Sequence, residues 1–153
     1  MPFRKEIFMA TLKTEITSSI YGYILSDEEK YIRARELNDV TIVYDDEYDI
    51  QLGDGKFVEL YDITHVYDDR YAISGSLTID VEIEIEDRHY TWEEYTDYIY
   101  ETTKAKVTKL LENAKELELD EVIVDVNENS DIKKFAVNHD IDAPKPLDYE
   151  LEK

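Results

Sequence analysis

Residues 77–86 alternate apolar and acidic side chains almost without interruption, and this stretch restricts the fold more than any other. In an extended strand, side chains at every second position point to the same side. Branched apolar residues at this period favour a strand over a helix. The stretch therefore predicts a strand with one face in the core and a row of carboxylates on the other face. The apolar set is Leu77, Ile79, Val81, Ile83 and Ile85, and the acidic set is Asp80, Glu82, Glu84 and Glu86.

Shorter alternating segments predict further strands before this one. Residues 7–17 alternate loosely and can continue to residue 24, with Gly22 marking a bend or bulge. Asp54-Gly55 accepts positive φ angles and predicts a hairpin between strands at 48–52 and 57–62. Other strands are predicted at 40–44, 65–67 and 71–74, the last two joined by Asp68-Asp69. Short turns between strands favour an antiparallel, meander-like sheet with one face in water.

The helical segments are predicted from their capping residues and apolar spacing. Ser26 begins a short helix that ends near residue 38. Thr91 and Glu94 form a capping box, and apolar residues then recur at steps of three and four as far as Leu117. This spacing predicts one amphipathic helix of about 39 Å. A last strand at 121–126, for which a parallel pairing is considered, and a short helix at 130–138 capped by Ser130 follow.

These elements predict an α+β fold. We expect an antiparallel, meander-like sheet packed by one long helix in the C-terminal half, with two short helices. Residues 1–143 are expected to form a single domain, and residues 144–153, which contain prolines and acids, a flexible tail.

The net charge of −21 on 153 residues restricts the partners. Nucleic acid and anionic membranes would be repelled, whereas basic proteins would be attracted. The charge is concentrated, because residues 44–69 and residues 80–101 each hold nine acids against one base. The chain has no cysteine, and no apolar run approaches the roughly 18 residues of a membrane span. We therefore expect a cytoplasmic protein.

Signatures of metal binding and catalysis are not found. The acids at 45–49 do not have the spacing of a calcium loop. Each histidine has an acid nearby, but further ligands in a recognised zinc-binding spacing are not present. No nucleophile elbow, phosphate-binding glycine loop or dinucleotide fingerprint is present. We therefore assign no catalytic residue, metal ligand or cofactor, and expect a protein that is not an enzyme.

Residues 107–117, 121–127 and 132–135 have a helix–strand–helix pattern of apolar and polar residues. Over about 30 residues, this pattern resembles part of the acetyl-CoA-dependent N-acetyltransferases. In that family a glycine-rich turn at the start of the helix holds the cofactor pyrophosphate, and the matching positions here are Thr102-Thr103-Lys104-Ala105-Lys106. The resemblance implies a degenerate acetyltransferase-like enzyme as an alternative function.

The row of acids also suggests a specific kind of recognition. Alternate residues of a strand lie roughly 6.6 Å apart, which is close to the roughly 6–7 Å between phosphates of one nucleic-acid strand. Tyrosines beside acids can receive an arginine by stacking and ion pairing. An ordinary solvent-facing strand has the same alternation, although ordinary surfaces mix both signs of charge. The candidate partner-binding residues are Tyr44, Asp45, Asp46, Glu47, Tyr48, Asp49, Asp68, Asp69, Asp80, Glu82, Glu84 and Glu86.

The function that we expect from this pattern is inhibition. The chain would neutralise a basic, nucleic-acid-handling protein, such as a nuclease, by imitating a phosphate backbone. By analogy of composition, such proteins include phage-encoded counter-defence proteins, among them anti-CRISPR proteins, and immunity proteins for nuclease toxins. The alternative from another class is a small acidic structural or assembly protein that forms homo-oligomers through an edge strand.

Overall fold

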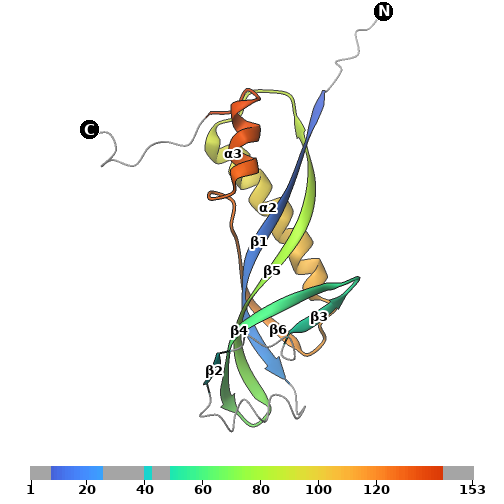
Figure 1. Cartoon of the computed structure of the whole chain (residues 1–153), viewed down its shortest axis with the longest axis vertical. Helices are drawn as coiled ribbons and strands as arrows, with labels where there is room; N and C mark the ends of the chain where they lie inside the picture. Colours follow the sequence, from blue (N-terminus) through green and yellow to red (C-terminus); the bar gives the residue numbers. More distant parts are fainter. Residues whose placement is uncertain (1–7, 26–39, 43–48, 143–153) are drawn as a thin grey trace, which may run out of the picture.

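The computed structural model describes residues 8–25, 40–42 and 49–142, which form an α+β fold with an antiparallel sheet and two helices (Figure 1). The strand order is β2-β4-β5-β1-β6, and β3 pairs with β4 away from this path. The strands are β1 (Met9–Leu25), β2 (Val40–Ile42), β3 (Ile50–Gly53), β4 (Lys56–Tyr67), β5 (Arg70–Glu86) and β6 (Leu117–Val124). The helices are α2 (Trp92–Leu111) and α3 (Ser130–Val137).

Strands β1 and β5 are the longest elements of the sheet and pair along their whole length, from Met9 opposite Glu86 to Leu25 opposite Arg70. Strand β4 pairs with β5 only as far as Ser76, and β6 pairs with β1 only over residues 18–24. Residues 9–17 and 78–86 therefore extend beyond the other strands as a two-stranded segment, called here the β1–β5 ribbon (Figure 1).

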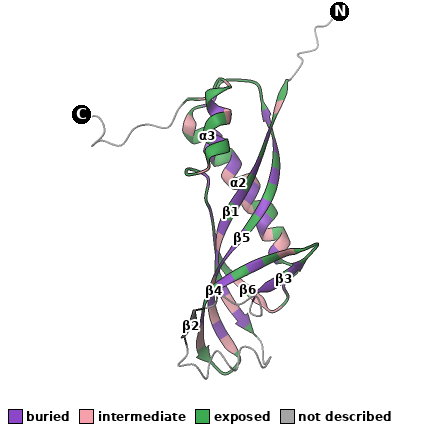
Figure 2. Cartoon of the chain, in the orientation of Figure 1, coloured by how far each residue is buried: buried purple, intermediate pink, exposed green. Residues whose placement is uncertain are grey.

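The two faces of this ribbon differ completely, as the alternating burial along β1 and β5 shows (Figure 2). The inner face carries apolar side chains such as Leu12, Ile16 and Ile83, each no more than 2% exposed. Helix α2 covers the core with Tyr95, Ile99, Val107 and Leu111, and α3 adds Ile132 and Ala136. Burial of these groups is the main favourable contribution to folding. The predicted strand with a buried apolar face and an exposed acidic face is confirmed.

The predicted meander is correct only in part. Strands β3, β4 and β5 follow one another through two hairpins, but β1 lies between β5 and β6 and has no neighbour close in sequence. The segments predicted at 57–62 and 65–67 form the single strand β4, and those at 71–74 and 77–86 form β5. The parallel pairing considered for the last strand is wrong, because β6 is antiparallel to β1.

The long helix is shorter than predicted. The capping box is confirmed, since Glu94 N–H donates to the Thr91 hydroxyl and Thr91 N–H donates to the Glu94 carboxylate. The helix ends at Leu111, however, and a turn carries buried Ala114 into the core before Leu117 begins β6. In that turn, the Asn113 side-chain amide donates to the Leu52 carbonyl at 3.0 Å. The cap of α3 is Asn129 and not Ser130.

Two local predictions from turn residues are confirmed. Asp54 and Gly55 have φ angles of 53° and 76° in the two-residue turn between β3 and β4. The register of β1 with β6 shifts between Tyr21 and Gly22, so Gly22 marks a bulge. The short helix predicted at 26–38 and the tail at 144–153 lie outside the described residues. Neither helix that the structure describes is long and apolar enough to span a membrane.

Candidate partner-binding site

The carboxylate row predicted at residues 80–86 lies on the exposed face of the β1–β5 ribbon. Asp80, Glu82, Glu84 and Glu86 are all exposed, since each alternates with a buried apolar residue of β5. On β1, the residues of the same face opposite them are Glu15, Lys13, Thr11 and Met9. This exposed face therefore holds five carboxylates against one lysine, so the expected array of negative charge is present.

Neighbouring side chains hold three of the four carboxylates in the row. Lys13 Nζ lies 3.6 Å from a Glu82 oxygen, and both side chains are about 70% exposed, so this ion pair contributes little to stability. The Thr11 hydroxyl donates to Glu84 at 2.7 Å. Arg88 Nε lies 3.4 Å from a Glu86 oxygen. The two bases reduce the charge of the row but do not cancel it.

The first turns of α2 bring a second group of acids to the end of this row. A short connection joins the end of β5 to the cap of α2 at Thr91, so Glu94 lies near Glu84 and Glu86. The Tyr98 hydroxyl donates to the Glu84 carbonyl at 3.0 Å, and this bond joins the helix to the open edge of β5. A strand that ends in acids and a helix that begins in acids thus meet at one place.

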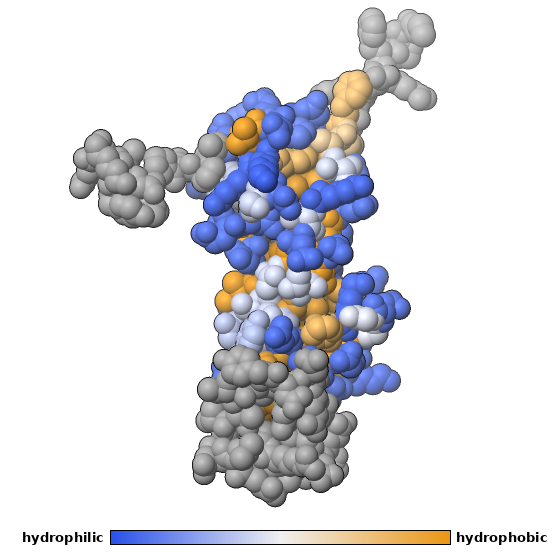
Figure 3. All heavy atoms as spheres, in the orientation of Figure 1, coloured by the Kyte–Doolittle hydropathy of each residue, from blue (hydrophilic) through white to orange (hydrophobic). Residues whose placement is uncertain are grey.

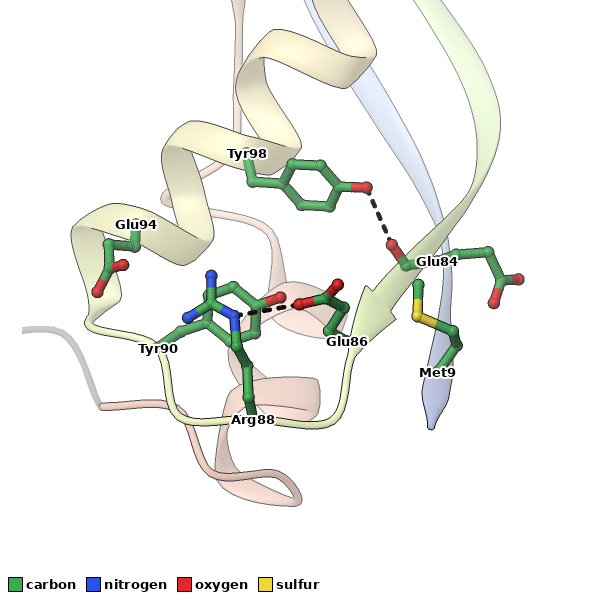
Figure 4. Close-up of a pocket in the computed structure, with 7 residues that line it drawn as sticks. All are labelled: Met9, Glu84, Glu86, Arg88, Tyr90, Glu94 and Tyr98. Carbon is green, nitrogen blue, oxygen red and sulfur yellow. Dashed lines mark hydrogen bonds and ion pairs between the residues drawn. The ribbon is translucent and has the colours of Figure 1, made fainter. Parts of the chain in front are cut away.

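A pocket with a volume of about 450 Å³ lies at this meeting point (Figure 4). It combines three carboxylates, one guanidinium, two phenol rings and one thioether. Its lining residues are Met9, Glu84, Glu86, Arg88, Tyr90, Glu94 and Tyr98. With three acids and one base, its walls carry a net charge of −2.

Arg88 lies inside this pocket and is held there by three contacts. Its guanidinium carbon lies 3.8 Å from the centroid of the Tyr90 ring, a typical cation–π distance. Its Nε pairs with Glu86, and one of its terminal nitrogens donates to the His89 carbonyl at 2.8 Å. Figure 4 shows the guanidinium against the Tyr90 ring with its contact to Glu86, and Tyr98 and Glu84 farther along the wall. The pocket therefore already accommodates one guanidinium group.

The helix cap favours the ionised form of Glu94. Hydrogen bonds from the Thr91 backbone and side chain lower the pKa of the Glu94 carboxyl, with smaller effects from Arg88 and His89. Glu94 therefore stays ionised at neutral pH. Within the described residues, no lysine or arginine forms an ion pair with Glu84 or Glu94.

The other predicted site residues do not join this group. Asp68 and Asp69 form the turn between β4 and β5, at the opposite end of β5 from Glu84 and roughly 45 Å away along the strand. Asp49 is only 6% exposed and is therefore not part of an exposed acidic surface. The candidates Tyr44, Asp45, Asp46, Glu47 and Tyr48 lie outside the described residues.

Sequence reasoning missed most of the pocket. Met9, Arg88, Tyr90, Glu94 and Tyr98 were not among the predicted binding residues, although two of them follow from signals in the sequence. The capping box places Glu94 in the first turn of the helix, and Tyr98 lies one turn further along the same side. The short connection from residue 86 to residue 91 requires that this turn lie near the end of the acidic strand.

The acetyltransferase-like segment does not form the cofactor site that the resemblance implies. Residues 102–106 lie in the middle of α2, where backbone N–H groups form hydrogen bonds within the helix. Within a helix, only the first turn has free backbone amides that could bind a pyrophosphate. No group of three or more potential metal ligands is found in the described part of the chain.

Comparisons with known proteins do not assign a function to this chain. No protein-family model, no curated protein and no solved structure matches this chain.

Proposed function

We propose that this protein is an acidic inhibitor that binds a basic, nucleic-acid-handling protein, such as a nuclease, through the exposed face of the β1–β5 ribbon. The observation that carries the proposal is the row of Asp80, Glu82, Glu84 and Glu86 on a face whose opposite side is packed into the core. Because the backbone is fixed by pairing with β1, the spacing of the carboxylates is fixed as well. A fixed spacing allows the row to compete for the groups that bind successive phosphates.

The distribution of polar residues supports a directed surface. The visible face in Figure 3 is largely hydrophilic in the upper part, where Figure 1 places α3 and the ends of β1 and β5. More apolar and neutral residues are visible in the middle of the molecule (Figure 3). Hydropathy does not distinguish acids from bases, but residues 80–101 hold nine acids against one base. A local excess of negative charge steers a basic partner toward that surface and raises the association rate.

The experiment begins with the partner captured from the source cell, and then measures whether this chain and duplex DNA compete for it. The variant Asp80→Ser/Glu82→Ser/Glu84→Ser removes three charges from the row. We expect it to weaken partner binding by at least about tenfold at low salt and to lose competition with DNA. The affinity of the unchanged chain should fall steeply as salt rises, because exposed charges are screened.

The matched control removes three exposed charges elsewhere, as Glu112→Ser/Asp120→Ser/Glu128→Ser. Both variants have the same net charge, so a difference between them reports the position of the charges. Circular dichroism verifies that each variant is folded. Equal binding by the two variants, or partner binding that DNA does not affect, would contradict the proposal. A self-association that resists salt would instead favour the structural or assembly protein.

A further inference from the structure

The pocket between the end of β5 and the start of α2 has the features of a receptor for one particular side chain. We propose that it receives an arginine of the partner protein, so that the ribbon face attracts the partner and the pocket fixes its register. This inference rests on the proposed function, and it adds a single anchoring residue to an otherwise electrostatic contact. A fully desolvated arginine is a common hot spot of protein interfaces.

The excess negative charge of the pocket favours a cationic ligand. Three acidic residues line the pocket, and of these only Glu86 forms an ion pair within the described residues, with Arg88. Glu94 is oriented by the helix cap and forms no ion pair with a described lysine or arginine, although Arg88 lies near enough to interact with its charge. The Glu84 carboxylate accepts from Thr11 on the exposed face of the ribbon. The pocket therefore has more negative than positive charge, and this excess favours the binding of a second cation.

The aromatic rings of the pocket favour arginine over lysine as the ligand. The Tyr98 ring is 43% exposed at the pocket wall, and its hydroxyl is anchored to the Glu84 carbonyl. A planar guanidinium stacks on such a ring and donates to carboxylates at the same time, which a lysine ammonium does less well. Figure 4 shows that Tyr98 and Glu94 both come from α2, and that the Tyr98 hydroxyl points toward the Glu84 backbone while the Glu84 carboxylate points away from the ring.

Arg88 shows within the chain itself how a guanidinium group binds in this pocket. It stacks on Tyr90, pairs with Glu86 and remains half exposed. An incoming arginine is expected to stack on Tyr98 and pair with Glu94 in the same way, while the Glu84 carboxylate points to the exposed face of the ribbon. Arg88 then competes for the same negative field, so its removal should strengthen binding.

The test uses short peptides and does not need the partner. Acetyl-Gly-Arg-Gly-amide, the matched lysine peptide and the citrulline peptide, a neutral isostere of arginine, are titrated into the labelled full-length protein at low salt. Backbone amide shifts in NMR spectra report the binding. We expect saturable shifts confined to residues 84–98, at least about fivefold tighter binding of arginine than of lysine, and no saturable binding of citrulline.

Variants with opposite expected effects strengthen the test. Tyr98→Ala should weaken arginine binding by at least about fivefold, whereas Tyr98→Phe keeps the ring and should retain it. Arg88→Ser should tighten binding by at least about threefold. Lys13→Ser is the matched control, since it changes the net charge equally but removes a base that pairs with Glu82 outside the pocket. It should have the smaller effect.

The possible results test the pocket inference and the proposed function of the ribbon face independently. The pocket inference would be overturned if arginine and lysine bound equally, if the shifts extended over residues 80–83, or if Arg88→Ser and Lys13→Ser had equal effects. The proposed function would still stand. If the pocket binds arginine but Asp80→Ser/Glu82→Ser/Glu84→Ser does not weaken partner binding, the proposed role of the carboxylate row is contradicted. Retained binding by a folded Tyr98→Ala protein would also overturn the inference.

Discussion

At the scale of single residues, the core contains hydroxyl groups that have no hydrogen-bond partner in the described structure. Thr103 Oγ1 is fully buried and unpaired, and Ser18 Oγ is in the same situation. By contrast, Thr96 on the same helix donates to the Trp92 carbonyl at 2.9 Å. A buried polar group without a partner costs free energy, whereas a paired one does not.

We expect Thr103→Val to raise the free energy of unfolding by about 1 kcal/mol, since valine has nearly the same shape and no hydroxyl. Thr96→Val is the matched control and should be neutral or destabilising because it removes a satisfied hydrogen bond. Urea denaturation followed by circular dichroism measures both. A loss of stability in Thr103→Val would show that its hydroxyl has a partner in solution.

At the scale of elements, a small clasp joins the loop before α2 to the chain after α3. Tyr90 N–H donates to the Asp140 carbonyl and Asp142 N–H donates to the Tyr90 carbonyl, each at 3.0 Å. His89 Nε2 lies 3.0 Å from an Asp142 carboxylate oxygen. The clasp therefore supports the loop that carries Arg88 and Tyr90 into the pocket.

The clasp predicts a pH dependence. The hydrogen bond to Asp142, with the charges of Asp142, Asp140 and Glu94, raises the pKa of His89 above its ordinary value despite an opposing contribution from desolvation. Protonated His89 thus favours the folded state. Its contribution is complete below about pH 6.5 and is lost as pH rises through the raised pKa.

NMR titration should give a pKa for His89 above about 6.5 in the unchanged protein and a lower value in Asp142→Asn. The melting temperature of the unchanged protein, relative to that of Asp142→Asn, should fall as pH rises from about 6 to 8. An identical pKa in both proteins would mean that the clasp does not form through these side chains.

The elements also show what could be predicted from the sequence. Strand β5, the Asp54-Gly55 hairpin, the Gly22 bulge and the capping box each depend on residues adjacent in the chain, and each was predicted. The end of α2 was missed because Ala114 and Leu117 continue the helical spacing while they pack from a turn and a strand. The place of β1 was missed because its partners β5 and β6 are distant in sequence, and local patterns do not specify which strands pair.

The candidate site, like the fold, could be predicted from the sequence only in part. The exposure of the acidic row follows from its alternation, so it could be predicted from residues 77–86 alone. The pocket requires that the ends of β1, β5 and α2 meet, and that Arg88 folds back over Tyr90. These are relations between elements, and the sequence indicates only that the connection between β5 and α2 is short.

At the scale of the whole molecule, the net charge of −21 opposes the compact state. Raising sodium chloride from about 20 mM to about 500 mM should therefore increase the melting temperature by a few degrees, because salt screens repulsion between exposed charges. Sucrose at matched osmolality provides a control that does not screen charge. A lower melting temperature in salt would mean that exposed ion pairs outweigh the repulsion.

The central position of β1 also has a consequence for biosynthesis. A ribosome releases residues 9–25 long before it has made residues 70–86 or 117–124, so the first strand must wait for both partners. Pairings between such remote segments make folding slow. Once β5 has paired with β1 and before β6 is complete, one edge of β1 is still open. At this stage the acids of β5 discourage two unfinished copies from joining edge to edge, because like charges repel.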